Sequence, residues 1–209
     1  ALIFLPHLDC FIARSILMSN KKSNNMSWQD QASDWLVSII VAVALAFCIR
    51  TFLFEPYMVE GSSMYPSLVN HERLIVDKLN HWISTPQKGE VVVFRYPKDQ
   101  SRDFIKRVIA TEGDSIEMKS GKVFVNGKQL NETYIWHKDP KGENISNYRK
   151  RVVPKGTIFV LGDNRNNSED SRFADVDMVP LDLVKGRAVA AFWPIDKMRV
   201  IGANDGLSK

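Results

Sequence analysis

Only two cysteines occur among the 209 residues, and both precede residue 49. Cys10 lies in the N-terminal segment and Cys48 lies in an apolar run, so nothing after Cys48 can form a disulfide. The larger part of the chain must therefore be held together by its hydrophobic core. The cysteine content excludes a disulfide-stabilised scaffold, but it does not assign a compartment.

A dominant charge is also lacking. The chain has 28 lysines and arginines against 24 aspartates and glutamates, a formal net charge of +4, and both signs are mixed along its length. Nucleic-acid-binding proteins concentrate basic residues in a patch or stripe. The charge pattern therefore favours an ordinary solvated surface, and we expect no nucleic-acid partner.

Histidine is scarce, and its spacing matches no zinc motif. The four histidines also lack a recognisable catalytic setting, so surface or loop positions explain them better. The four histidines are His7, His71, His81 and His137. We expect no metal and no cofactor.

An uncharged run at residues 35–49, WLVSIIVAVALAFCI, dominates the N-terminal part. Counted through Phe54, it approaches the roughly 20 residues that span a bilayer. Arg50, near its end, can extend its charged group to the lipid headgroups. A helix in a soluble core keeps a polar stripe, and this run has none beyond Ser38. We therefore predict a transmembrane anchor over residues 35–54.

The basic residues around this run predict its orientation. Lys21 and Lys22 precede it, and lysine and arginine favour the cytoplasmic side of a membrane. We expect a single-pass protein of the plasma (inner) membrane, with residues 1–34 cytoplasmic and residues 55–209 forming an extracytoplasmic domain. Residues 1–17 are explained either as upstream translation or as a weak extra contact, and we assign them no function.

Short β-like runs separated by turn residues fill the rest of the chain. Residues 122–130 combine two such runs with Asn-Gly between them, which indicates a hairpin. Strands and helices do not alternate, which argues against a parallel α/β sheet. We predict a mainly β fold with an antiparallel sheet, from which 131–151 departs as a long loop or a small excursion. The main predicted strands are 73–76, 90–94, 104–109, 115–118, 122–125, 157–161 and 187–193.

The segment 57–68, YMVEGSSMYPSL, places small hydroxyl residues soon after the predicted anchor. Ser62 and Ser63 stand between a glycine and a methionine, in a turn-prone stretch. Such a segment is either a linker or a turn that presents a nucleophile at the membrane surface. A serine hydroxyl becomes a good nucleophile only when another group accepts its proton. The second interpretation therefore requires a base elsewhere in the chain.

Lys106, in the segment DFIKRVIATEGD, is a candidate for that base. In a strand over 104–109, side chains alternate between two faces, so Phe104, Lys106 and Val108 share one face. Burial lowers the pKa of a lysine, and a shift of about 3 units from about 10.4 would leave a neutral amine near pH 7. The alternative is an amphipathic strand whose lysine extends into solvent, and the strand pattern alone favours that alternative.

A third segment, residues 157–172, reads TIFVLGDNRNNSEDSR. An apolar strand runs into a turn dense in hydrogen-bonding side chains, which could be a well-capped surface turn. A buried neutral lysine, however, needs a partner that orients it. A serine hydroxyl in this segment could serve that purpose.

The three segments, in this order behind an N-terminal anchor, resemble bacterial type I signal peptidases of the compact, single-anchor type. The resemblance covers roughly residues 54–194 and rests on GSSMYPSL, on GEVVVFRYP followed by FIKRVIATEGD, on VLGDNRNNSEDSR and on GRAVAAFWP. It implies a membrane-bound serine endopeptidase that removes signal peptides from exported preproteins. Cleavage is implied to follow small-x-small sites such as Ala-x-Ala, and the mechanism requires no metal.

The resemblance also implies residue roles. Ser63, immediately before methionine, is the implied nucleophile, Lys106 the implied general base of a Ser–Lys dyad, and Ser168 the implied partner that orients the lysine. Gly61 stands where some members have a serine whose hydroxyl binds the oxyanion, which leaves the second oxyanion donor open. The residues implied to shape and brace the site are Arg107, Asp163, Arg165, Asp170 and Arg172.

Substrate contacts and competing functions follow from the same segments. An extended substrate is expected to pair with a sheet edge, and Met58, Val59, Gly61 and Ser62 are candidates to contact it. The expected partners are exported preproteins and the lipid bilayer. Two other functions stay open: an anchored β domain that binds partners without catalysis, and a self-cleaving Ser–Lys regulator. The regulator would need a DNA-binding head where this chain has its apolar run.

Overall fold

The computed structural model describes residues 28–48, 53–78, 84–136 and 147–202. The chain divides into two compact units, Ala1–Cys48 and Ile49–Lys209. Several sequence predictions lie outside the described residues. They concern residues 1–17, the basic residues of the N-terminal segment, Arg50, and the histidines at 7, 81 and 137.

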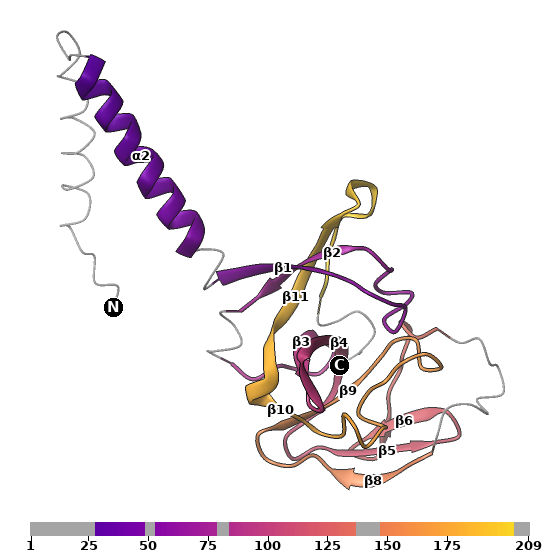
Figure 1. The fold of residues 1–209 in the computed structure, drawn as a ribbon. Helices are drawn as coiled ribbons and strands as arrows, with labels where there is room; N and C mark the ends of the chain where they lie inside the picture. Colours follow the sequence, from indigo (N-terminus) through magenta and orange to yellow (C-terminus); the bar gives the residue numbers. More distant parts are fainter. Residues whose placement is uncertain (1–27, 49–52, 79–83, 137–146, 203–209) are drawn as a thin grey trace, which may run out of the picture. The chain divides into compact units, whose positions relative to one another are not determined.

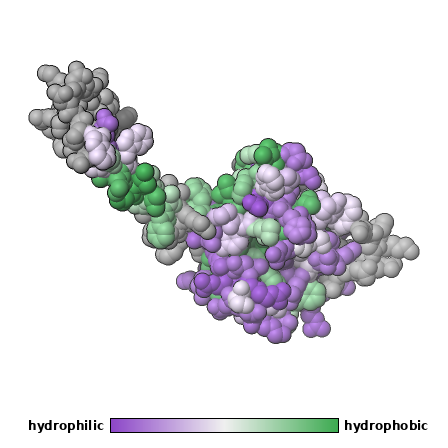
Figure 2. Space-filling view, turned by 45° about the horizontal axis from the view of Figure 1, so that its top comes forward, coloured by the Kyte–Doolittle hydropathy of each residue, from purple (hydrophilic) through white to green (hydrophobic). Residues whose placement is uncertain are grey.

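The described part of the first unit is one helix, α2 (Trp28–Cys48), shown in Figure 1. It begins before the predicted start at residue 35, since WQDQASD continues the helix toward the N-terminus. Large apolar side chains along it, among them Trp35, Ile39 and Val43, are more than half exposed. Figure 2 shows hydrophobic side chains on the surface of this helix. In the part of the chain that the structure describes, no helix is long and apolar enough to cross a membrane.

The second unit contains a large antiparallel sheet with the strand order β1-β2-β11-β3-β4-β9-β10, and β12 pairs with β11 (Figure 1). The prediction of a mainly β, antiparallel fold is confirmed. Strand β4 is longer than predicted and lies between β3 and β9, near the middle of the sheet. The strands are β1 (Phe54–Met58), β2 (Arg73–Asp77), β3 (Val91–Tyr96), β4 (Asp99–Thr111), β9 (Thr157–Leu161), β10 (Val179–Pro180), β11 (Val184–Trp193) and β12 (Arg199–Val200).

A smaller sheet follows, with the order β7-β6-β5-β8. The predicted hairpin is present, and Asn126 and Gly127 both have positive φ angles, as a tight two-residue turn requires. The stretch 131–151, expected to be a loop or a small excursion, contributes most of β8 to this sheet. Its strands are β5 (Ser115–Lys119), β6 (Lys122–Val125), β7 (Lys128–Gln129) and β8 (Tyr148–Val152).

The core covers both faces of β4, as period-two alternation predicts for a central strand. Val108 belongs to one buried cluster, against which Phe104 packs. Ile109 belongs to another cluster, which includes Ile116 and Phe159. Lys106 therefore shares its face with apolar residues, as predicted.

Candidate active site

The turn that carries Ser63 is fixed to the domain on both sides. It follows β1, and Met64 and Leu68 just beyond it are each only 1% exposed. Gly61 has a φ of +94°, a conformation that glycine adopts without strain, and its N–H donates to Asn70 Oδ1 at 2.8 Å. The segment 57–68 is therefore an ordered part of the domain, not a free linker.

Lys106 lies beside this turn. Its Nζ donates hydrogen bonds of 3.0 Å to Ser63 Oγ and 3.0 Å to the carbonyl oxygen of Ile105. The side chain is 4% exposed, and Nζ lies 5.0 Å from the centre of the Phe104 ring. The alternative in which this lysine extends into solvent is wrong, because residues from neighbouring segments cover both faces of β4.

Burial also sets the protonation of Lys106. Desolvation lowers its pKa to about 8, against the opposing influence of Asp170, Glu169 and Asp163, whose negative charges favour the ammonium form. The amine is thus mostly neutral above about pH 8. It can accept a proton from Ser63 Oγ at the distance observed.

Arg107 points to the opposite face and joins β4 to the loop after β9. Its Nε and one terminal nitrogen donate to the two carboxylate oxygens of Asp163 at 2.9 and 2.7 Å, and the other terminal nitrogen donates to Gly89 O at 2.9 Å. The two side chains are 1% and 0% exposed. The Tyr134 ring lies 4.3 Å from the guanidinium carbon. This pair couples the lysine-bearing strand to the loop at 162–172.

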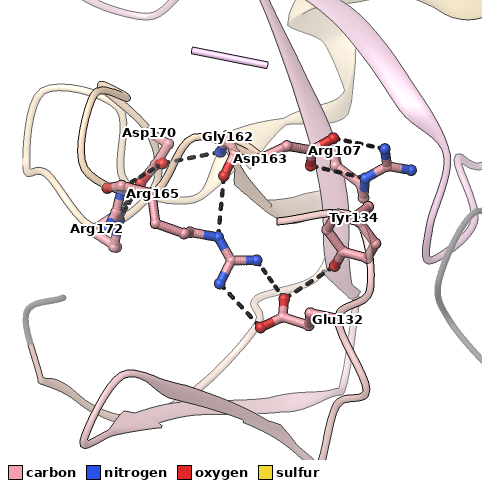
Figure 3. Close-up of polar contacts among 8 residues, drawn as sticks. All are labelled: Arg107, Glu132, Tyr134, Gly162, Asp163, Arg165, Asp170 and Arg172. Atoms are coloured by element: carbon pink, nitrogen blue, oxygen red, sulfur yellow. Dashed lines mark hydrogen bonds and ion pairs between the residues drawn. The ribbon is translucent and has the colours of Figure 1, made fainter. Parts of the chain in front are cut away.

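A second set of ion pairs braces the same loop (Figure 3). Arg165 donates through both terminal nitrogens to the carboxylate of Glu132 and through Nε to Gly162 O at 3.1 Å. Arg172 donates to Asp170 at 2.7 and 2.8 Å, and Asp170 also accepts from Gly162 N at 3.0 Å. The bracing expected for Asp163, Arg165, Asp170 and Arg172 thus has a geometric basis.

Glu132 was not predicted from the sequence. It lies in the polar stretch taken as a loop, and its side chain is only 5% exposed against Arg165 at 1%. An acid before a Thr-Tyr-Ile-Trp stretch carries no local signal of burial. Only its contact with Arg165, 33 residues away, reveals its role.

Ser168 is buried close to Gly162, but its Oγ has no hydrogen-bond partner among the described residues. A Cβ placed on Gly162 would lie 2.1 Å from Ser168 Oγ and 2.6 Å from the Ser63 carbonyl oxygen. Gly162 is therefore the point where the loop, Ser168 and the Ser63 turn come closest. The orienting role of Ser168 stays a prediction.

A cleft of about 510 Å³ opens beside Ser63 and Lys106. Of the four residues expected to contact substrate, Met58 and Val59 line it and Gly61 and Ser62 do not, and the substrate contacts themselves stay predictions. In the described ranges, no group of three histidine, cysteine or acidic side chains is placed to hold a metal ion. The other residues that line the cleft include Tyr57, Glu60, Arg102, Asp103, Phe104 and Glu169.

Ser62 instead faces the loop after β9. Its Oγ accepts a hydrogen bond of 2.7 Å from Asn167 Nδ2, and its carbonyl oxygen accepts one of 3.1 Å from Asn164 Nδ2. The backbone N–H of Asn164 donates to Ser63 O at 2.9 Å. Neither asparagine was predicted from the sequence to support the site.

The chemistry available here is that of a serine hydrolase with a lysine base. A serine hydroxyl beside a buried lysine of lowered pKa, at the wall of a cleft, is suited to nucleophilic acyl transfer.

Comparisons with known proteins assign the class. A family model described as signal peptidase, peptidase S26, matches residues 32–193. The chain therefore belongs to the signal peptidase family, peptidase S26, and it is a serine endopeptidase.

Relatives by sequence agree with this assignment. The chain is 40% identical over 171 residues to signal peptidase I P of Bacillus subtilis subsp. natto, covering 79% of this chain and 91% of the relative. It is 40% identical over 187 residues to signal peptidase I of Bacillus amyloliquefaciens, covering 87% and 93%. A crystal structure of a signal peptidase I from Enterococcus faecalis V583 is 27% identical, with a TM-score of 0.43, and covers 50% of this chain and 97% of that chain.

Proposed function

We propose that this protein removes signal peptides from exported preproteins, with Ser63 as nucleophile and Lys106 as general base. The observation that carries the proposal is the 3.0 Å contact between Lys106 Nζ and Ser63 Oγ, made by a lysine whose pKa is lowered by burial to about 8. Family membership supports the class of reaction. The residue roles rest on the geometry of the cleft.

The proposed reaction has two halves. Neutral Lys106 accepts the Ser63 hydroxyl proton while Ser63 Oγ attacks the scissile carbonyl carbon, and the resulting lysine ammonium protonates the leaving amine as the acyl-enzyme forms. Lys106 then accepts a proton from water, whose oxygen attacks the ester carbonyl carbon. Collapse of the second intermediate returns the proton to Ser63 Oγ.

Stabilisation of the oxyanion is proposed to involve the backbone N–H of Ser63. The Gly61 N–H is engaged by Asn70, and Gly61 has no hydroxyl to offer. Each oxyanion donor in a preorganised site typically contributes a factor of about 10² to 10³ in kcat. The second donor stays open.

The substrate is proposed to be the cleavage region of a signal peptide in extended form, with small side chains at the small-x-small positions. Met58 and Val59 lie in the cleft beside Ser63, and Val59 is buried. The apolar wall that these two residues form next to the nucleophile suits small apolar side chains such as alanine.

The place of action is proposed to be the extracytoplasmic surface of the plasma membrane. The uncharged run at 35–49 supports a single-pass anchor over 35–54, with residues 1–34 cytoplasmic. Exposed Trp193, Ile195 and Met198, beside the β11–β12 connection, add apolar surface to the larger unit. Tryptophan in particular suits a membrane interface.

The proposal is tested with the full-length chain in detergent and a preprotein that carries an Ala-x-Ala site. Cleavage is expected for the unaltered protein and for Lys98→Ala, a control at an exposed lysine. Ser63→Ala and Lys106→Ala are each expected to abolish it. Cleavage that persists after either change would refute the assignment of Ser63 and Lys106 as the catalytic dyad. If the unaltered protein cleaves no preprotein, the alternative of a domain that binds partners without catalysis would be favoured.

A further inference from the structure

The segment around Ser62 and Ser63 is anchored at its ends by Asn70 and by buried Met64, but few hydrogen bonds form within the Ser62–Ser63 turn itself. Ser62 is exposed and Ser63 is only partly buried. Within the turn, Tyr65 N donates to Ser62 O at 3.1 Å, and Gly61 has open space around it. A turn that includes so permissive a residue needs outside support to keep a side chain within reach of its base.

Two asparagines from a distant segment supply three hydrogen bonds to this turn. Asn167 Nδ2 donates to Ser62 Oγ at 2.7 Å, and Asn164 Nδ2 donates to Ser62 O at 3.1 Å. Asn164 N donates to Ser63 O at 2.9 Å. The two side-chain bonds connect residues that are 105 and 102 positions apart in the sequence. They join the Ser62–Ser63 turn to the loop after β9, whereas the proposed base, Lys106, lies on β4.

The segment that provides these bonds is itself rigidly held. Its neighbours Asp163 and Arg165 form buried ion pairs with Arg107 and Glu132. Asn167 N also donates to Asn164 O at 3.0 Å, which closes a turn between the two asparagines. Arg107 directly follows Lys106 on β4, so the same loop is tied to the strand that carries the base.

We infer that Asn167 and Asn164 are positioning residues that hold Ser63 Oγ within proton-transfer distance of Lys106 Nζ through the Ser62–Ser63 turn. The inference deepens the proposed function and rests on it where cleavage is the readout. Neither asparagine itself lines the cleft. They act through Ser62 and the Ser63 backbone.

A double-mutant cycle on one of these bonds tests the inference. Asn167→Ala and Ser62→Ala remove the same hydrogen bond from opposite ends. Each is expected to lower kcat about tenfold with KM nearly unchanged, and the double variant is expected to lose no more than either single one. Independent sites would instead multiply to about a hundredfold. Asn166→Ala, an exposed neighbour, is the matched control and should retain full activity.

Two further readouts separate positioning from general damage. In Asn167→Ala, the pH at which kcat/KM falls on the acidic side should equal that of the unaltered protein, because the burial of Lys106 is unchanged. The melting temperature should also stay close to that of the control. A lowered melting temperature that accounts for the lost activity would overturn the inference.

A crystal structure of Asn167→Ala makes the test independent of cleavage. The distance between Ser63 Oγ and Lys106 Nζ is expected to exceed its present 3.0 Å by more than about 0.5 Å, the tolerance of a productive constellation. The inference would be overturned if this distance were unchanged or if Asn167→Ala were as active as Asn166→Ala. It would also be overturned if the losses in kcat of Asn167→Ala and Ser62→Ala multiplied in the double variant. If the unaltered protein cleaves nothing, the proposed function fails, and this distance alone decides the positioning role.

Discussion

Lys106 Nζ and Ser63 Oγ are 3.0 Å apart although 43 residues separate them. Ser63 lies in the turn after β1, a strand at the edge of the large sheet, whereas Lys106 lies on β4 near its middle. The loop after β9 contacts both regions through Asn164 and Asp163. The candidate dyad therefore depends on three distant segments that meet beside one cleft.

The activity is expected to rise with pH through about 8. Burial lowers the pKa of Lys106 to about 8, and only the neutral amine accepts a proton, so kcat/KM should fall on the acidic side of that value. The pH dependence of preprotein cleavage between pH 6 and 10 measures this limb. A limb centred near the ordinary lysine value would contradict the assignment of Lys106 as base.

Replacing Glu169 by glutamine should move that limb to lower pH. Glu169 lines the cleft, and its negative charge raises the pKa of Lys106. Removing the charge lowers the pKa further, which leaves more neutral amine at pH 7 and raises the activity there. Asp182→Asn, at an exposed acid, is the control and should leave the limb in place. Identical profiles for Glu169→Gln and the control would refute the electrostatic role of Glu169.

Substituting Gly162 by alanine should damage the site severely. The new Cβ would meet Ser168 Oγ at 2.1 Å and Ser63 O at 2.6 Å, and contacts below 3.0 Å force atoms to move. We expect kcat/KM to fall by at least about 10²-fold, as misplacement by about 1 Å can do. Full activity in Gly162→Ala, measured beside the unaltered protein, would contradict this prediction, because it would show that Ser168 and the Ser63 turn can shift without a loss of catalysis.

Replacing Glu132 by alanine should destabilise the domain. The change leaves Arg165 buried without its carboxylate partner, and breaking a buried ion pair in this way typically costs about 3–5 kcal/mol. Urea unfolding of the full chain in detergent measures the loss. The exposed pair of Lys98 and Asp175 provides the comparison, because Asp175→Ala should change the stability by less than about 1 kcal/mol.

Replacing Lys106 by methionine should abolish activity but stabilise the fold at neutral pH. The folded pKa of about 8 lies below the unfolded value of 10.5, so between these values the unfolded chain binds more protons and stability rises with pH. Below about pH 8 the unaltered protein bears the full penalty of a buried ammonium, on the order of 3 kcal/mol. The stability difference between Lys106→Met and the unaltered protein should shrink from pH 8 to 10.5. A difference that is constant with pH would contradict the lowered pKa.

Much of the fold was accessible from local patterns. Alternation along 104–109 correctly placed Lys106 on an apolar face, and the Asn126–Gly127 turn correctly predicted the hairpin. These features depend on neighbours within a few residues, because the period of a strand and the φ angles of a turn are local properties. The three motif segments also pointed to the serine and the lysine that the structure brings together.

Other features were decided only by tertiary structure. The strand pattern alone favoured a solvent-facing lysine, whereas the burial of Lys106 depends on groups that pack against its face of β4, among them the Ser63 turn and the Phe104 ring. Glu132, Asn164 and Asn167 carry no local signal, since their partners lie from 33 to 105 residues away. Burial and pairing depend on which strands become neighbours, and strand order is set by the packing of the whole sheet. For that reason the sequence could name Ser63 and Lys106 as the candidate dyad, while the lowered pKa of Lys106 and the support of the Ser63 turn arise only in the folded chain.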